Sequence, residues 1–120
     1  MLTIVGLGPG SRSYLSRDAY DALTSAEKVY LRTSWHPVLE ELELEYESFD
    51  DAYEQAQDFD TLYRQIAETV YQASLGGDVV FAVPGSPYQA EDTVRHLLEM
   101  TDARVIPGVS FVEPVLQALQ

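Results

Sequence analysis

Asp78-Val79-Val80-Phe81-Ala82-Val83-Pro84-Gly85-Ser86-Pro87 is the stretch of sequence that decides the fold. Residues 79–83 are apolar at successive rather than alternate positions, which predicts a strand that is covered on both faces. The strand must end at 84–87, because proline cannot donate to the backbone ladder and glycine favours a turn. A strand of this kind belongs at the centre of a parallel sheet with helices on either side.

Strands and helices alternate on both sides of this segment. The short apolar runs that predict further strands are 2–7, 28–32, 46–49 and 103–106. Helical patterns begin at the cap residue Ser16, at Pro37, at Phe59 and near Ala90, and a last amphipathic helix is expected over 110–120. The alternation predicts an α/β fold with a mostly parallel sheet of about five strands and helices on both faces.

Composition narrows the class of protein. The chain has 120 residues, 46% of them apolar, which is enough for a single core and one domain. Twenty Asp and Glu against seven Lys and Arg give a net charge of −13. Nucleic acids and anionic membrane surfaces are therefore disfavoured as partners, because both attract clustered cations.

Several chemistries are excluded or disfavoured by what the sequence lacks. There is no cysteine, which rules out disulfides and thiolate chemistry. No apolar run approaches the roughly 20 residues of a membrane span, and the first residues lack the basic region of a signal peptide. A cytoplasmic protein is expected. The acidic stretch 40–54 lacks a calcium-loop pattern and is interpreted as a solvated face.

Three glycine-proline breaks follow predicted strands, at 6–10, 84–87 and 107–110. Ligands of parallel α/β sheets bind at the edge formed by the carboxyl ends of the strands, and all three breaks should lie there. Glycine allows a ligand to approach the backbone closely, while proline fixes the turn. Any α/β domain needs turns at strand ends, but three such breaks at one edge favour a binding site.

A dinucleotide site is a weaker alternative for the first break. The G-x-G-x-x-G pattern would need glycine at position 11, where the chain has Ser11, and Pro9 interrupts the turn. Arg32 stands where an acidic residue normally contacts the ribose, although an arginine there can accept the 2′-phosphate of NADP. An NADP-dependent enzyme therefore stays open, whereas a P-loop is absent.

The ordered set of motifs resembles the amino-terminal half of the tetrapyrrole (corrin/porphyrin) methylase family. The resemblance rests on residues 5–10, on Ser86-Pro87 after the fourth strand and on 107–110 after the fifth. Residues 30–33 with His36-Pro37, and residues 81–87, are similar to the branch that is fused to a MazG-type nucleotide pyrophosphohydrolase. The likeness covers the whole chain, which is then a single α/β domain over 1–120 and the amino-terminal subdomain of a longer protein.

This resemblance implies an S-adenosylmethionine-dependent methyltransferase that acts on a small, tetrapyrrole-like molecule and forms a homodimer. The cofactor would lie between two α/β subdomains, so the fragment alone would be inactive. The positions that match the family's cofactor loops are Pro9, Pro84, Gly85, Ser86, Gln89, Ser110 and Phe111. No metal is implied. A non-catalytic module that serves the fused pyrophosphohydrolase is the alternative.

Three residues depart from the family pattern. Ser86 replaces a common aspartate, Phe111 replaces a small residue, and Arg32 replaces a carboxylate that serves some relatives as a proton acceptor. Arginine stays protonated and cannot act as a base, so no catalytic residue is assigned. Arg32, Thr33, His36 and Tyr88 are instead candidate substrate contacts. A solvated strand-end Arg32 and a helix-start His36 remain the open alternative.

Overall fold

The computed structural model describes residues 1–10, 14–87 and 92–108. In these described parts of the chain, five strands form one sheet: β1 (Leu2–Gly6), β2 (Lys28–Leu31), β3 (Glu47–Ser48), β4 (Val79–Val83) and β5 (Ala103–Ile106). The helices between them are α1 (Arg17–Ser25), α2 (Val38–Glu41), α3 (Asp50–Gln55), α4 (Phe59–Ser74) and α5 (Asp92–Met100). No helix among the described residues is long and apolar enough to span a membrane.

The sheet is parallel throughout and has the order β3-β2-β4-β1-β5. β4 lies at its centre, between β2 and β1, and all five of its residues are buried. The central position predicted for 79–83 is therefore confirmed. Burial of this strand on both faces is why its sequence is apolar without alternation.

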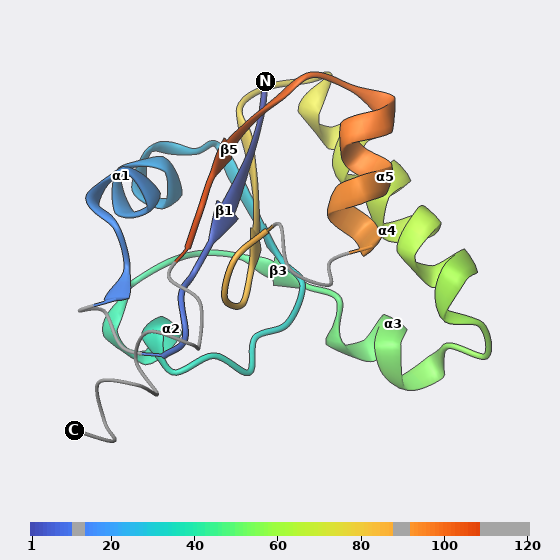
Figure 1. Cartoon of the computed structure of the whole chain (residues 1–120), viewed down its shortest axis with the longest axis horizontal. Helices are drawn as coiled ribbons and strands as arrows, with labels where there is room; N and C mark the ends of the chain where they lie inside the picture. The colour runs from blue at the N-terminus through green and yellow to red at the C-terminus, as the bar shows by residue number, and fades with distance from the viewer. Residues whose placement is uncertain (11–13, 88–91, 109–120) are drawn as a thin grey trace.

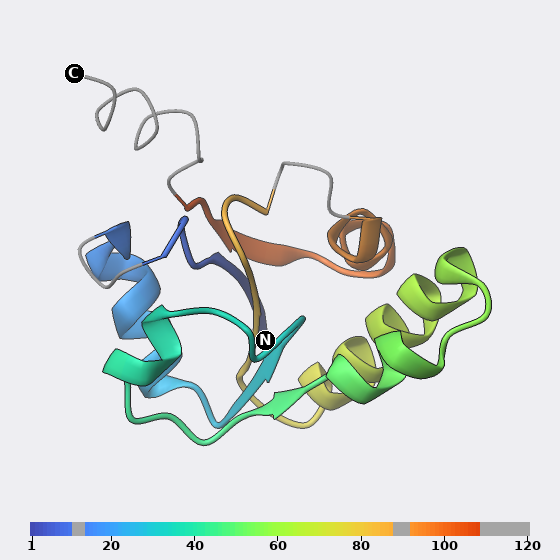
Figure 2. The same ribbon diagram turned by 90° about the horizontal axis from the view of Figure 1, so that it is seen from below.

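Helices cover both faces of the sheet, as the sequence predicts. Val79, Phe81 and Val83 of β4 pack into a core with α4 and α5, and Val80 and Ala82 pack into a second core with α1 and α2. Figure 1 shows α1 and α2 on one side of the sheet and α3, α4 and α5 on the other. The view in Figure 2 shows the same three layers from below.

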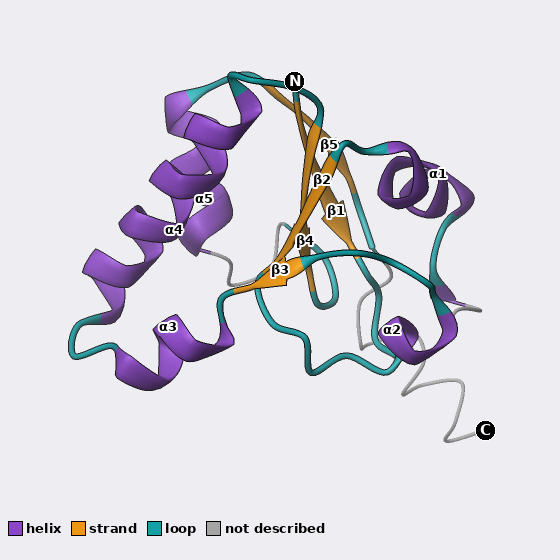
Figure 3. Ribbon diagram, turned by 180° about the vertical axis from the view of Figure 1, so that it is seen from behind, coloured by secondary structure: helices purple, strands orange, loops and turns teal. Residues whose placement is uncertain are grey.

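The predicted element boundaries differ from the observed ones mainly around β3. β3 has two residues instead of the four predicted, and α3 was not predicted, because 50–55 is too polar to show an apolar stripe. Figure 3 shows α3 following β3 directly. The start of α1 is as predicted: the Ser16 hydroxyl accepts a hydrogen bond from the Ala19 nitrogen at 3.1 Å. The predicted helix over 110–120 lies outside the described residues.

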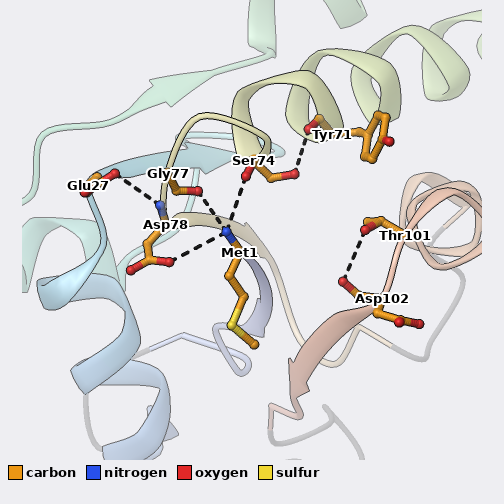
Figure 4. Close-up of polar contacts among 8 residues, drawn as sticks. All are labelled: Met1, Glu27, Tyr71, Ser74, Gly77, Asp78, Thr101 and Asp102. Atoms are coloured by element: carbon orange, nitrogen blue, oxygen red, sulfur yellow. Dashed lines mark hydrogen bonds and ion pairs between the residues drawn. The ribbon is translucent and has the colours of Figure 1, made fainter.

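The amino-terminal edge of the sheet is closed by polar contacts of the first residue. The Met1 ammonium donates to the carbonyl oxygens of Ser74 at 3.3 Å and Gly77 at 3.0 Å and lies 3.6 Å from a carboxylate oxygen of Asp78 (Figure 4). Glu27 accepts a hydrogen bond from the Asp78 nitrogen at 3.1 Å. These contacts join the start of β1 to the turn between α4 and β4, at the end opposite to the glycine-proline loops.

Candidate functional site

The loops that follow β1, β4 and β5 touch one another at the carboxyl edge of the sheet. A Cβ atom at Gly6 would lie 2.5 Å from the Gly108 nitrogen and 2.6 Å from the Gly85 oxygen. A Cβ at Gly108 would lie 2.1 Å from the same Gly85 oxygen. Only glycine allows backbones to approach this closely, so the sequence places glycine in all three loops. The prediction that the loops share one edge is confirmed.

A short backbone bridge joins the first two loops. The Gly8 nitrogen donates to the Gly85 oxygen at 3.1 Å, and the Gly85 nitrogen donates to the Gly8 oxygen at 3.0 Å. Gly8 has φ of +74° and Gly85 has φ of +65°, conformations that side chains with a Cβ rarely adopt. Both glycines are buried, whereas Pro9, Gly10, Pro84 and Ser86 around them keep part of their surface exposed. The bridge thus forms the buried base of the three loops. We call the described residues of these loops, 6–10, 84–87 and 107–108, the three-loop rim.

His36 links the loop after β2 to the Gly8–Gly85 bridge. Its Nε2 lies 2.8 Å from the Gly8 oxygen, and its Nδ1 accepts a hydrogen bond from the Val38 nitrogen at 3.2 Å. Since Nδ1 accepts, the proton of the neutral ring is on Nε2, which donates to Gly8. The side chain is buried, with 7% of its surface exposed, and both ring nitrogens are occupied by the backbone.

Asp50 fixes the other end of the same loop. Its carboxylate accepts hydrogen bonds from the Thr33 hydroxyl at 2.6 Å and from the Ser34 nitrogen and hydroxyl at 3.0 and 2.5 Å. Burial opposes ionisation of this carboxyl, but the hydrogen bonds from Ser34 and Thr33 outweigh it and lower the pKa of Asp50 to about 2. Asp50 is therefore ionised at neutral pH, and its hydrogen bonds link the loop after β2 to the start of α3.

Aromatic packing explains why Asp50 lies beneath that loop. Phe49, the residue before α3, stacks on Tyr30 of β2 with ring centroids 5.6 Å apart and meets Phe81 of β4 edge-on at 6.3 Å. The Phe49 nitrogen also donates to the Leu31 oxygen at 3.3 Å. These contacts fix the start of α3 against β2, which carries the loop that Asp50 binds, and β4, which carries one of the three glycine-proline loops.

The predicted site residues fall into three groups. Pro9, Pro84, Gly85 and Ser86 lie together around the Gly8–Gly85 bridge. Among the candidate substrate contacts, Thr33 donates to Asp50, His36 is buried against Gly8, and Arg32 is half-buried at the end of β2, where its backbone nitrogen donates to the Ala82 oxygen. The predictions for Tyr88, Gln89, Ser110 and Phe111 lie outside the described residues.

Sequence reasoning missed Asp50 and Trp35. Asp50 belongs to a stretch interpreted as a solvated face, and its position two residues after the Glu47–Ser48 strand was the available signal. Trp35 is 83% exposed and, with Pro37, Leu39 and Tyr46, lines a surface hollow of about 490 Å³ beside His36. The described residues hold no cluster of His, Cys, Asp or Glu suited to a metal ion.

Comparisons with known proteins place the chain among relatives of the same family and fold. YabN of Bacillus subtilis (strain 168), described as uncharacterized, is 39% identical over an alignment of 127 positions that covers 99% of this chain and 26% of YabN. A uroporphyrin-III-C-methyltransferase from Thermus thermophilus aligns with a TM-score of 0.69 and 22% identity, over 98% of this chain and 51% of its own. The methyltransferase CobJ aligns with a TM-score of 0.68 and 19% identity, over 98% of this chain and 49% of CobJ.

The chain also aligns with a uroporphyrin-III C-methyltransferase from Thermus thermophilus that was solved in complex with S-adenosylhomocysteine. The TM-score is 0.60 and the identity 22%, over 91% of this chain and 45% of the methyltransferase. At these identities the structural likenesses show the shared fold. The chain spans about half the length of the methyltransferases and about a quarter of YabN. The sequence profile of the Tetrapyrrole (Corrin/Porphyrin) Methylases matches residues 1–120, and the chain belongs to this family.

Proposed function

We propose that this chain is the amino-terminal subdomain of an S-adenosylmethionine-dependent methyltransferase and supplies one wall of the cofactor cleft. The observation that carries the proposal is the three-loop rim, whose buried base is the Gly8–Gly85 bridge. Family membership and the S-adenosylhomocysteine complex of a structural neighbour support this cofactor over NADP. The second wall would come from the half of the fold that this chain does not span.

The residues of the rim suit a cofactor that is held mainly by backbone. Pro9 and Pro84 fix the two turns, and the bridged glycines keep the loops from shifting when a ligand enters. The bound cofactor would supply an electrophilic methyl group on a sulfonium. The protein's contribution is then to orient the two reactants and to exclude water, so a general base is not required of Arg32.

Calorimetric titration with S-adenosylhomocysteine tests the proposal on the natural full-length protein. We expect saturable binding to this ligand and none to NADPH. Gly10→Leu adds bulk to the rim where a Cβ meets no described atom within 4 Å, and it should weaken binding while leaving the melting temperature unchanged. Gly76→Leu, at the end of α4, is the matched control. Absence of any binding by the wild-type protein would refute the cofactor.

We propose that the methyl acceptor is an acidic, tetrapyrrole-like molecule. Arg32 directly follows β2 at the carboxyl edge of the sheet, and a guanidinium pairs with carboxylates in a bidentate manner. Arg32→Gln should weaken the binding of uroporphyrin, a carboxylate-rich probe, with little effect on binding of S-adenosylhomocysteine. Equal uroporphyrin affinity in the variant and the wild type would remove Arg32 from the substrate site.

A non-catalytic ligand-binding module is the second candidate. YabN is about twice as long as the Thermus methyltransferase, because the chain is 26% of the first and 51% of the second. YabN therefore has room for a further domain, which supports the expectation that a MazG-type pyrophosphohydrolase is fused to this chain as well. Cofactor binding without methylation of any tetrapyrrole, together with nucleotide hydrolysis that responds to the cofactor, would favour this role.

We expect the parent protein to be a cytoplasmic homodimer. Sedimentation would test the oligomeric state, and cell fractionation would test the location.

A further inference from the structure

We infer that His36 is a positioning residue that couples the loop after β2 to the cofactor loops. The inference rests on the cofactor role proposed above for the three-loop rim. The coupling path combines hydrogen bonds with a short piece of backbone. Asp50 accepts from Thr33 and Ser34, His36 lies two residues after Ser34 and donates to the Gly8 oxygen, and Gly8 is bridged to Gly85.

The geometry assigns His36 this role rather than direct contact with a substrate. Both ring nitrogens are occupied, Nε2 by the Gly8 oxygen and Nδ1 by the Val38 nitrogen, and the side chain is 7% exposed. The Gly8 oxygen accepts from both His36 and Gly85, which fills its two lone-pair positions. A displacement of the loop after β2 therefore moves an acceptor that the bridge between the cofactor loops also uses.

Two substitutions separate the two hydrogen bonds of His36. The amide of Gln reaches the position of Nε2 and can still donate to Gly8, whereas the shorter Asn can place an acceptor only near Nδ1, toward Val38. His36→Asn should therefore weaken the binding of S-adenosylhomocysteine by the full-length protein roughly 3- to 10-fold, the range expected for one hydrogen bond. His36→Gln should bind like the wild type. His96→Asn, on α5, controls for the loss of a histidine elsewhere.

Asp50→Asn tests the far end of the path. The variant replaces an ionised acceptor of Thr33 and Ser34 by a neutral amide and should weaken S-adenosylhomocysteine binding as well. If His36 carries the coupling, the double variant Asp50→Asn/His36→Asn should bind no more weakly than His36→Asn alone. Simple additivity of the two losses would overturn the coupling.

Hydrogen exchange measured without ligand provides a readout that does not depend on the cofactor. The amides of Gly8 and Gly85 should exchange faster in His36→Asn than in His36→Gln or the wild type, at equal melting temperature. Equal exchange and equal affinity in the Asn and Gln variants would overturn the inference. If the wild-type protein binds no S-adenosylhomocysteine, the proposed function fails, while the exchange rates still decide whether His36 holds the bridge.

Discussion

At Gly108 the space for a side chain is filled by the backbone of two other loops. A Cβ there would lie 2.1 Å from the Gly85 oxygen and 2.9 Å from both the Gly6 carbonyl carbon and the Gly8 nitrogen. Backbone atoms cannot rotate away as the end of a flexible side chain can, so the loops would have to separate. The contact between the loops therefore depends on the absence of a single methyl group.

Gly108→Ala should lower the free energy of unfolding by about 1 to 3 kcal/mol, the range for inserting a methyl group where the neighbouring atoms already fill the space. Gly76→Ala is the matched control, because a Cβ at Gly76 lies 3.8 Å from its nearest neighbour, the Ala73 oxygen. Urea unfolding of both variants measures the difference. A Gly108→Ala variant as stable as Gly76→Ala would show that the three loops are not in contact in solution.

Asp50 makes stability depend on pH in the acidic range. Its pKa is about 2 in the folded protein against 3.8 for an unperturbed carboxyl, so the folded state favours the ionised form. A depressed pKa contributes stability that is complete above about pH 4 and is lost as the pH falls toward about 2. The direction follows because the unfolded chain binds the proton at a higher pH than the folded chain.

Asp50→Asn should therefore cost about 1 to 2 kcal/mol at neutral pH, and the cost should shrink between about pH 4 and 2. Urea unfolding at several pH values measures the difference between variant and wild type. The exposed neighbour Asp51→Asn serves as the control in the same helix turn. A difference that does not change with pH would mean that Asp50 does not hold Thr33 and Ser34 through its charge.

At the scale of elements, hydrophobic pattern and turn chemistry predicted most of the fold. The unbroken apolar run at 79–83 predicted the central strand, and the stripe from Phe59 predicted α4. The pattern could not predict α3, which contains no buried residue and is fixed by its neighbours: Phe49 packs on Tyr30, and Asp50 accepts from the loop after β2. Contacts between segments so far apart leave no periodic signal in the sequence.

In the candidate site too, features set by local sequence could be predicted, whereas contacts between distant segments could not. The glycines of the three-loop rim were visible in the sequence because a required backbone conformation restricts the residue type. The hydrogen bond between His36 and Gly8 joins residues 28 positions apart, and nothing local marks it. His36 therefore appeared in the sequence as a candidate substrate contact, a role that stays a prediction, while its buried geometry supports the positioning role.

Phe81→Ala tests the central position of β4. Phe81 is fully buried in the core shared with α4 and α5, and its loss should lower the free energy of unfolding by about 3 to 5 kcal/mol. Phe59→Ala is the matched control: Phe59 is 55% exposed, stacks on Tyr63, and should cost less than about 1 kcal/mol. Similar losses for the two variants in urea unfolding would contradict the assignment of β4 to the sheet centre.

At the scale of the whole molecule, the two ends of the sheet differ in their contacts and in their exposure. The amino-terminal edge is closed by the contacts of Met1 with Gly77 and Asp78, whereas the carboxyl edge keeps Pro9, Pro84 and Ser86 partly exposed. The chain spans about half of the methyltransferases that share its fold. The carboxyl edge is therefore the side on which we propose that the cofactor and the second half of the fold would lie.

The net charge of −13 gives a last prediction that concerns the molecule as one body. Within the described part of the chain, the ion pairs Lys28–Glu47 at 3.5 Å and Arg95–Asp92 at 3.6 Å lie at exposed positions, where solvent screens them and each contributes little to stability. Repulsion among the carboxylates should therefore exceed these attractions. Salt reduces the range of such interactions from about 30 Å at about 0.01 M to about 8 Å at about 0.15 M.

The free energy of unfolding, measured with urea, should consequently rise between these two concentrations of sodium chloride. Screening weakens the repulsion among carboxylates more than the attraction between opposite charges. Replacing the exposed Glu43 and Glu45 by glutamine removes two negative charges between α2 and β3 and should raise stability at low salt, which narrows the gain from added salt. Stability that falls as salt is added would mean that attractive pairs dominate this surface. In that case the excess of carboxylates would be balanced locally, and the low number of cations would not limit the stability of the fold.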